Sequence, residues 1–347
     1  MARIVVLGGS GFLGSRVVAG LKKAGADVSV ASRRSEVKVD ATKPETFSAL
    51  EPFDVVVDLS DTVSNPPDAL IAWCLERGKC VIEATSEAPC VERLHAAHVG
   101  TKGRLVLGGG IFTGVSNLLA RDVANRVGAA DRVELGVASS PFSGSGTGTI
   151  ALMVKALEVP AVRYENGKRI EEPTVRRGPS LDYAGVIRPT GYMSLAEPFM
   201  IHTSTHAPKV DVVFAPKPGV LVPAFTLVPG WLARNRIFQA FMRGHFTVLR
   251  RVLLRSVSSS VELTATAAGK QGEVRRWVTT PDGMEAGGYA LAAMAEAIAA
   301  TSADWSGVKM IDDVTELEPI IARANVLAGA QLLALSARSE AVQTRAA

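Results

Sequence analysis

A glycine-rich segment near the N-terminus restricts the possible folds of this chain more than any other sequence feature. It reads Gly8-Gly9-Ser10-Gly11-Phe12-Leu13-Gly14 and satisfies both the GxGxxG and the GxxGxxG spacing. The β-branched run Arg3–Leu7 precedes it, and Phe12–Lys23 carries apolar residues at helical spacing. This strand–turn–helix places backbone amides and a positive helix end, worth about half a charge, against an anion. Because glycines permit close approach of a pyrophosphate, the segment predicts a dinucleotide site.

The residues after the second predicted strand, Asp27–Ala31, indicate which dinucleotide binds. An NAD enzyme usually carries Asp or Glu there for the ribose diol, but this chain has Ser32, Arg33 and Arg34, and no carboxylate before Glu36. A 2'-phosphate suits a hydroxyl and two guanidinium groups, with each charge-assisted hydrogen bond worth roughly 1.5–3 kcal/mol. The alternative is two solvated arginines on a loop. We therefore predict NADP(H) as the cofactor.

Three further polar residues follow predicted strands where the cofactor should pass. Asp40 comes after the short strand Val37–Val39, where it either contacts the adenine or caps a turn. Ser60 and Thr62 follow the apolar run Asp54–Leu59, which is typical of a fully buried parallel strand. We expect these two hydroxyls beside the nicotinamide half.

The spacing of predicted elements indicates two domains, as the length of 347 residues also favours. Up to about residue 120, strands alternate with helices, which predicts a Rossmann-type doubly wound parallel sheet. Beyond it the pattern is that of an α+β domain. Strands are predicted at Asp131–Ala138, Phe199–Thr203, Val210–Phe214 and Ser260–Ala267, and helices at Thr149–Leu157, Trp231–Met242, His245–Arg255, Met284–Ala300 and Val314–Ser336. We assign residues 1–120 plus about 305–347 to the dinucleotide domain and 121–304 to a substrate and dimerisation domain.

Composition argues against several classes of protein. The net charge of +4 is small for this length, so nucleic acid is not an expected partner. Cys74, Cys80 and Cys90 are odd in number and lack CxxC or zinc spacing, which predicts buried thiols, no metal and a reducing compartment. Because no signal peptide or apolar 20-residue stretch is present, we expect a cytoplasmic protein.

Several motifs resemble the saccharopine dehydrogenase-like oxidoreductases, including polyamine and lysine dehydrogenases. They are GGSGFLG, GKCVIEATSE, GGGIFTGVSNLLARDVA, SPFSGSGTGTIALM and GVKMIDDV, spread over most of the chain. The chain departs from that pattern at Glu83, where the family more often has Asp, and at Thr113, where Pro is usual before Gly114.

The resemblance implies hydride transfer between NADPH and a C=N bond, with the active site between two domains. Relatives also reduce C=C bonds, so an enoyl reductase acting on a hydrophobic or carrier-bound substrate is the first alternative. The second is an NADP-binding sensor or interaction protein without catalysis, which the absence of an unmistakable proton donor keeps open.

Candidate acids and substrate ligands are expected in the second domain. His202 and His206 flank Ser204 near the end of a predicted strand, and Tyr192 is a further candidate; each is otherwise a packing residue. The Gly- and Ser-rich stretch 139–149 is either a flexible connection or a substrate-binding loop. Its candidate ligands are Ser143, Ser145 and Thr147.

Tyr164 and Lys168 have the Tyr-x-x-x-Lys spacing of short-chain dehydrogenases. Asn166-Gly167 between them predicts a hairpin turn, which would break the helix that this chemistry requires. The missing Tyr/Lys helix disfavours an NAD(P)-dependent epimerase.

Residues 229–257 combine arginines with aromatic residues and lack any acidic residue. The segment is a lid over a hydrophobic substrate, a docking site for an anionic carrier or membrane surface, or a helical pair that packs on the sheet or a dimer partner. We favour packing over membrane contact, and we expect a homodimer that acts on a small-molecule substrate.

Overall fold

The structure is a computed structural model that describes residues 2–62, 65–140, 156, 159–174, 176–217, 219, 259–301, 304–336 and 340–341. The chain forms two compact units. Unit 1 comprises Met1–Leu118 and Met284–Leu333, and unit 2 comprises Leu119–Gly283 and Ala334–Ala347. Residues 284–304 thus belong with the dinucleotide domain, whereas the end of the chain belongs with unit 2.

Unit 1 is built on a parallel sheet with the strand order β15-β6-β5-β4-β1-β2-β3. The strands are β1 Ile4–Leu7, β2 Val28–Ser32, β3 Val37–Lys38, β4 Val55–Asp58, β5 Cys80–Glu83, β6 Arg104–Leu107 and β15 Gly307–Met310. Residues of β1, β4 and β5 are buried throughout, because helices cover both faces of the sheet. The order reverses between β4 and β1, which creates the crevice at the carboxyl ends of the strands where such sheets bind ligands.

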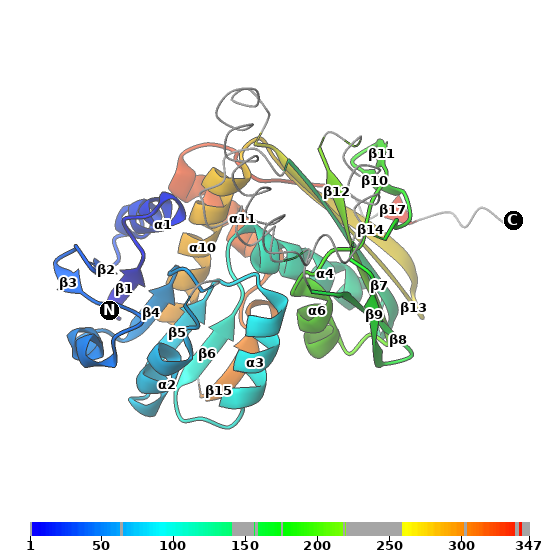
Figure 1. Cartoon of the computed structure of the whole chain (residues 1–347). Coiled ribbons are helices and arrows are strands. Elements are labelled where there is room, and N and C mark those ends of the chain that lie inside the picture. The colour runs from blue at the N-terminus through cyan, green and yellow to red at the C-terminus, as the bar shows by residue number, and fades with distance from the viewer. Residues whose placement is uncertain are drawn as a thin grey trace, which may run out of the picture. The chain divides into compact units, whose positions relative to one another are not determined.

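The helices of unit 1 lie on both sides of this sheet (Figure 1). They are α1 Phe12–Lys23, α2 Asp68–Glu76, α3 Ala88–His98, α10 Gly283–Ala300 and α11 Leu317–Ala328, with short turns η1 Pro44–Leu50, η2 Ile111–Val115 and η3 Ile311–Asp313. Helices α2 and α3 share one face, and α1 and α10 pack together on the other. Their approach is close at Gly20, where a Cβ atom would lie 2.6 Å from the Cβ of Ala292.

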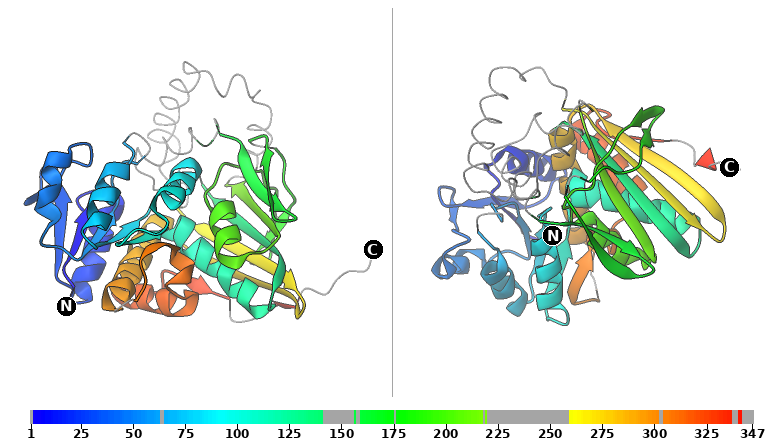
Figure 2. Two further views of the ribbon diagram at one scale, coloured as in Figure 1. Left: turned by 90° about the horizontal axis from the view of Figure 1, so that it is seen from below. Right: turned by 45° about the vertical axis from the view of Figure 1, so that its right-hand side comes forward.

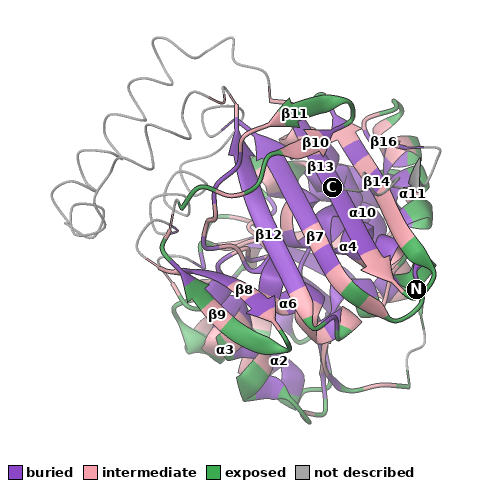
Figure 3. Cartoon of the chain, turned by 90° about the vertical axis from the view of Figure 1, so that its right-hand side faces the viewer, coloured by how far each residue is buried: buried purple, intermediate pink, exposed green. Residues whose placement is uncertain are grey.

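Unit 2 contains a mixed sheet with the order β16-β14-β13-β7-β12-β8-β9, and β17 pairs with β14. The strands are β7 Ala130–Ser139, β8 Ala161–Glu165, β9 Lys168–Glu172, β12 Lys209–Pro216, β13 Val261–Gly269, β14 Gly272–Thr280, β16 Ala334–Leu335 and β17 Glu340–Ala341. The long strands β7, β13 and β14 stand out in Figure 2. Helices α4 Ser116–Arg126 and α6 Glu197–Thr205 lie on one face (Figure 3), and the hairpin β10 Leu181–Tyr183 and β11 Val186–Arg188 crosses the other.

The predicted fold class, a Rossmann-type sheet with a second α+β domain, is confirmed. The predicted strand Phe199–Thr203 is wrong, because these residues lie in α6. Its β-branched residues are compatible with a helix here: Thr203 and Thr205 donate their hydroxyls to the carbonyl oxygens of Phe199 and Ile201 one turn back.

The predicted final helix, Val314–Ser336, is too long at both ends. Helix α11 stops at Ala328, where Gly329 adopts a left-handed φ of 72°, and Ala334–Leu335 pairs with β14 instead. The predicted helices Trp231–Met242 and His245–Arg255 lie outside the described residues, as does Thr149–Leu157 apart from Ala156. Within the described ranges, no helix has both the length and the apolar composition of a membrane span.

Candidate dinucleotide site

The glycine-rich loop joins β1 to α1 and is held by the strands on either side. The Gly8 amide donates to Ala31 O at the end of β2, and the Leu59 amide after β4 donates to Leu7 O. Gly8 has a φ of 77°, and a Cβ there would lie 2.7 Å from Leu59 O. A Cβ at Gly14 would collide with the Gly8 carbonyl oxygen. The chain's own packing therefore requires these glycines, in addition to any pyrophosphate.

Helix α1 begins in this loop without a side-chain cap. Its first amides, from Phe12 to Gly14, precede the first intrahelical bond, which Ser15 N donates to Gly11 O. Gly11, at the start of the helix, is exposed. This cradle of glycine backbone and helix amides fits a pyrophosphate.

The end of β2 offers the groups expected for a 2'-phosphate. Ser32 Oγ accepts hydrogen bonds from the Arg34 and Ser35 amides at 3.1 and 3.0 Å, which shapes the turn. Arg33 and Arg34 are exposed, and within the described residues neither forms an ion pair. Two exposed guanidinium groups beside a hydroxyl match the donors that a phosphate monoester accepts.

The other predicted cofactor residues lie at the same edge of the sheet. Asp40 Oδ1 accepts from the Thr42 amide and hydroxyl at 3.0 and 2.7 Å, and these bonds lower the pKa of Asp40. Asp40 therefore shapes a turn, and its contact with adenine stays a prediction. Thr62 Oγ1 lies 3.0 Å from Thr85 Oγ1, and Ser60 is the second residue after β4.

Sequence reasoning missed two carboxyl groups beneath these hydroxyls. Asp58 ends β4, Glu83 ends β5, and each is 1% exposed. Burial raises the pKa of both groups, and that of Glu83 rises further because Asp58 is close. A carboxylate at the last position of two successive apolar strands was the signal that could have identified them.

Two of the three predicted acids, His202 and Tyr192, lie apart from each other. His202 on α6 stacks on Tyr164 with ring centroids 3.9 Å apart, and its Nδ1 lies 2.9 Å from Ala207 O. Tyr164 pairs with Val210 in β12, whereas Tyr192 OH lies 3.4 Å from Asp211 Oδ1, the next residue along that strand. Because successive strand residues point to opposite faces, His202 and Tyr192 lie on opposite faces of the sheet and do not form one catalytic centre.

The remaining candidates differ in exposure and environment. His206 is exposed and caps α6 in a left-handed conformation, with a φ of 56°. Burial raises the pKa of Tyr192 to about 12, so its hydroxyl is neutral near pH 7. Ser143, Ser145 and Thr147 lie outside the described residues, as do residues 229–257.

Tyr164 and Lys168 form the predicted hairpin. Tyr164 lies in β8 and Lys168 in β9, and Asn166 and Gly167 both have positive φ, at 53° and 72°. The helix that a Tyr-x-x-x-Lys pair requires is therefore absent at this position. Thr113 also departs from the family pattern in conformation, because its φ of 57° is closed to proline.

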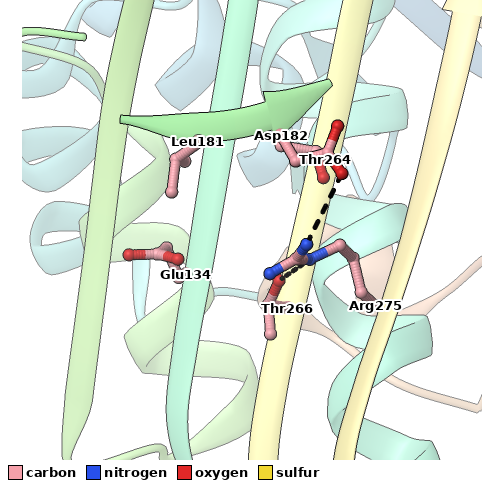
Figure 4. A pocket seen from close by; sticks show the side chains of 6 residues that line it. All are labelled: Glu134, Leu181, Asp182, Thr264, Thr266 and Arg275. Carbon is pink, nitrogen blue, oxygen red and sulfur yellow. Dashed lines mark hydrogen bonds and ion pairs between the residues drawn. The ribbon is translucent and has the colours of Figure 1, made fainter. Parts of the chain in front are cut away.

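A small hollow occurs on the hairpin face of the unit 2 sheet (Figure 4). Arg275 from β14 donates to Thr266 Oγ1 at 3.1 Å and lies 3.8 Å from Asp182 Oδ2. Glu134 on β7 lines the opposite side, and burial raises its pKa. Of these charges, Arg275 and Asp182 pair with each other. In the described part of the chain, no three His, Cys, Asp or Glu side chains are grouped to hold a metal ion.

Part of unit 1 matches a known protein family. Residues 4–104 match the model of the NAD dependent epimerase/dehydratase family, a range that contains the glycine loop and the ends of β2, β4 and β5 but not the Tyr164 hairpin. No curated protein matches the chain.

Several solved structures are similar over nearly the whole chain. Amine dehydrogenase from Mycobacterium smegmatis is 10% identical, with 91% of this chain and 97% of that chain covered and a TM-score of 0.39. The WlbA (WbpB) dehydrogenase from Thermus thermophilus, in complex with NAD and UDP-GlcNAcA, is 14% identical, with 94% and 95% covered and a TM-score of 0.39. Dihydrodipicolinate reductase from Paenisporosarcina sp. TG-14 is 11% identical, with 91% and 100% covered and a TM-score of 0.35.

These structural similarities are too low to carry a substrate assignment. The family match, by contrast, coincides with the part of unit 1 in which the glycine loop, the helix end and the switch point meet. Together, the match and the geometry support assignment of the chain to the NAD(P)-dependent oxidoreductases.

Proposed function

We propose that the protein is an NADP-dependent, saccharopine dehydrogenase-like oxidoreductase that transfers hydride between NADPH and the C=N bond of a small-molecule substrate. The observation that carries the cofactor choice is the end of β2, where Ser32 is followed by two exposed arginines that form no ion pair within the described residues. The C=N chemistry rests on the sequence motifs shared with that family.

Different residues along the carboxyl edge of the sheet bind different parts of the cofactor. The loop from Gly8 to Gly14 and the first turn of α1 hold the pyrophosphate, and Ser32 with the arginines holds the 2'-phosphate. Ser60 and Thr62 border the nicotinamide half. When bound, the cofactor supplies or accepts the hydride.

Within unit 2, His202 is the acid that we propose for proton transfer. Its Nδ1–H donates to Ala207 O, which fixes the ring and leaves Nε2 as the nitrogen that takes up a proton and delivers it to the substrate. Stacking on Tyr164 limits rotation of the imidazole. His206 and Tyr192 remain alternative acids.

The three buried free cysteines suit a cytoplasmic protein. We propose that this protein acts as a homodimer.

Turnover with a defined panel of substrates tests this function. Loss of NADPH absorbance is expected with a keto acid plus an amine, and not with enoyl thioesters. Turnover of enoyl thioesters alone would instead identify a C=C reductase. Binding of NADPH without turnover of any panel member would contradict the enzymatic assignment and identify a sensor.

The proton donor is tested by His202→Asn, which keeps a nitrogen donor for Ala207 O but removes Nε2. We expect kcat to fall by about 10²–10⁴-fold, the usual contribution of a general acid, while the Kd for NADPH is unchanged. Tyr192→Phe and His206→Asn are the matched variants and should retain kcat. If one of them loses kcat and His202→Asn does not, that residue is the acid instead.

A further inference from the structure

Two carboxylic acids meet inside unit 1, below the turns that border the nicotinamide half of the proposed cofactor site. Asp58 and Glu83 are partners in register on the parallel strands β4 and β5, so their side chains leave the sheet on the same face. Each is the last residue of its strand. Neither is accessible to bulk water, since each is 1% exposed.

One oxygen of each carboxyl is bound by a backbone amide. Asp58 Oδ1 accepts from the Ser60 amide at 2.8 Å, and Glu83 Oε1 accepts from the Thr85 amide at 2.9 Å. The second oxygens, Asp58 Oδ2 and Glu83 Oε2, are buried and have no hydrogen-bond partner among the described residues. Two adjacent carboxylates have no proton to donate, so a hydrogen bond between these paired residues requires that one of them is protonated.

Among the described residues, the titratable groups that face the pair include no cation that would stabilise a second negative charge. The titratable groups facing the pair are Cys74 and Asp68 on α2 and Cys90 on α3. Burial raises the pKa of both thiols to about 12, so they stay neutral. The Asp68 carboxylate is bound by Arg93 through two bonds of 2.9 Å, and neither Asp58 nor Glu83 has an ion pair within the described residues.

The pair is connected to the cofactor turns through short hydrogen bonds. Asp58 fixes the Ser60 amide, the Thr62 amide donates to Ser60 O at 3.0 Å, and the Thr62 hydroxyl contacts that of Thr85. Glu83 fixes the Thr85 amide from the other side. Each carboxyl of the pair is therefore bonded to one of the two turns.

We propose that Asp58 and Glu83 share one proton and act as a positioning pair that holds the turns at Ser60, Thr62 and Thr85 in the arrangement that receives the nicotinamide half of NADP(H). This inference rests on the proposed cofactor function. The two residues contact the turns and not the reacting atoms.

The shared proton makes stability and binding depend on pH. Because the pKa of Glu83 is higher in the folded than in the unfolded chain, its contribution to stability is complete at low pH and is lost as pH rises through the folded value. Above that pH, two adjacent carboxylates repel each other and the turns separate. The Kd for NADPH should then increase by up to about tenfold per pH unit.

Glu83→Gln tests the proposal, because its amide nitrogen can donate to Asp58 at any pH while its oxygen still accepts from Thr85. Asp58→Asn is the reciprocal variant. Glu76→Gln, at an exposed end of α2, is the matched control. For each protein, the Tm without cofactor and the Kd for NADPH are measured from about pH 5 to about pH 9, a window around the usual stability maximum.

We expect Tm and affinity to fall with rising pH in the wild type and in Glu76→Gln, and both profiles to be flatter in Glu83→Gln and Asp58→Asn. If the Tm profile of Glu83→Gln keeps the wild-type slope, proton sharing is wrong. If only its Tm profile flattens and its Kd profile does not, the pair is structural and the positioning role is wrong. If the wild type binds NADPH at no pH, the proposed function and the positioning role both fail, while the Tm profiles still decide whether the proton is shared.

Discussion

Replacement of both Arg33 and Arg34 with alanine is expected to raise the Kd for NADPH by about 10²-fold, with little effect on the Kd for NADH. Each charge-assisted hydrogen bond to a phosphate contributes roughly 1.5–3 kcal/mol, and about 1.4 kcal/mol corresponds to a tenfold change in Kd. NADH lacks the 2'-phosphate, so it loses no such bond. The thermal shift that NADPH gives beyond NADH in the wild type should disappear in the double variant.

A charge-matched variant separates specific contacts from the general field of the protein. Lys22→Ala with Lys102→Ala removes the same two positive charges from exposed positions, one at the end of α1 and one just before β6. This double variant should keep the preference for NADPH. A similar loss of NADPH affinity in both double variants would show that net charge, and not the end of β2, sets the preference.

Replacement of Gly14 with alanine is expected to abolish binding of NADPH and NADH alike and to lower Tm. The new methyl group would collide with Gly8 O and lie 2.7 Å from Gly9 Cα, so backbone and not a flexible side chain must move. Overpacking of this kind typically costs about 1–3 kcal/mol. The displaced loop would no longer present its amides to the pyrophosphate.

Gly20→Ala distinguishes loss of the site from loss of stability. It lies on the same helix, but its methyl group would contact Ala292 on α10, away from the glycine loop. We expect Gly20→Ala to lower Tm and leave the Kd for NADPH unchanged when both are measured well below the Tm. Retention of NADPH affinity by Gly14→Ala would refute the predicted role of the loop.

The sequence predicts the dinucleotide half well because its signals are local. The predicted helix Phe12–Lys23 matches α1, and the predicted strands at residues 27–31 and 54–59 each lie within a residue of β2 and β4. Glycine spacing, β-branched runs and helical periodicity each act over a few residues. The fold of unit 1 follows from them.

Predictions that depend on distant partners are less accurate. Residues Phe199–Thr203 have strand-like composition, but Pro198 suits the first turn of a helix, and packing of α6 on β8 and β12 decides the outcome. Likewise, the separation of His202 from Tyr192 depends on strand pairing between Tyr164 and Val210, which no local pattern contains. The Asp58–Glu83 contact requires the register of two strands 25 residues apart.

The most direct test of the account is calorimetric titration of the wild-type protein with NADPH and with NADH at one ionic strength. If the end of β2 binds the 2'-phosphate, NADPH should bind with a Kd at least about tenfold lower than that of NADH, as even one charge-assisted bond would give. Equal affinities, tighter binding of NADH, or no binding of either dinucleotide would contradict it.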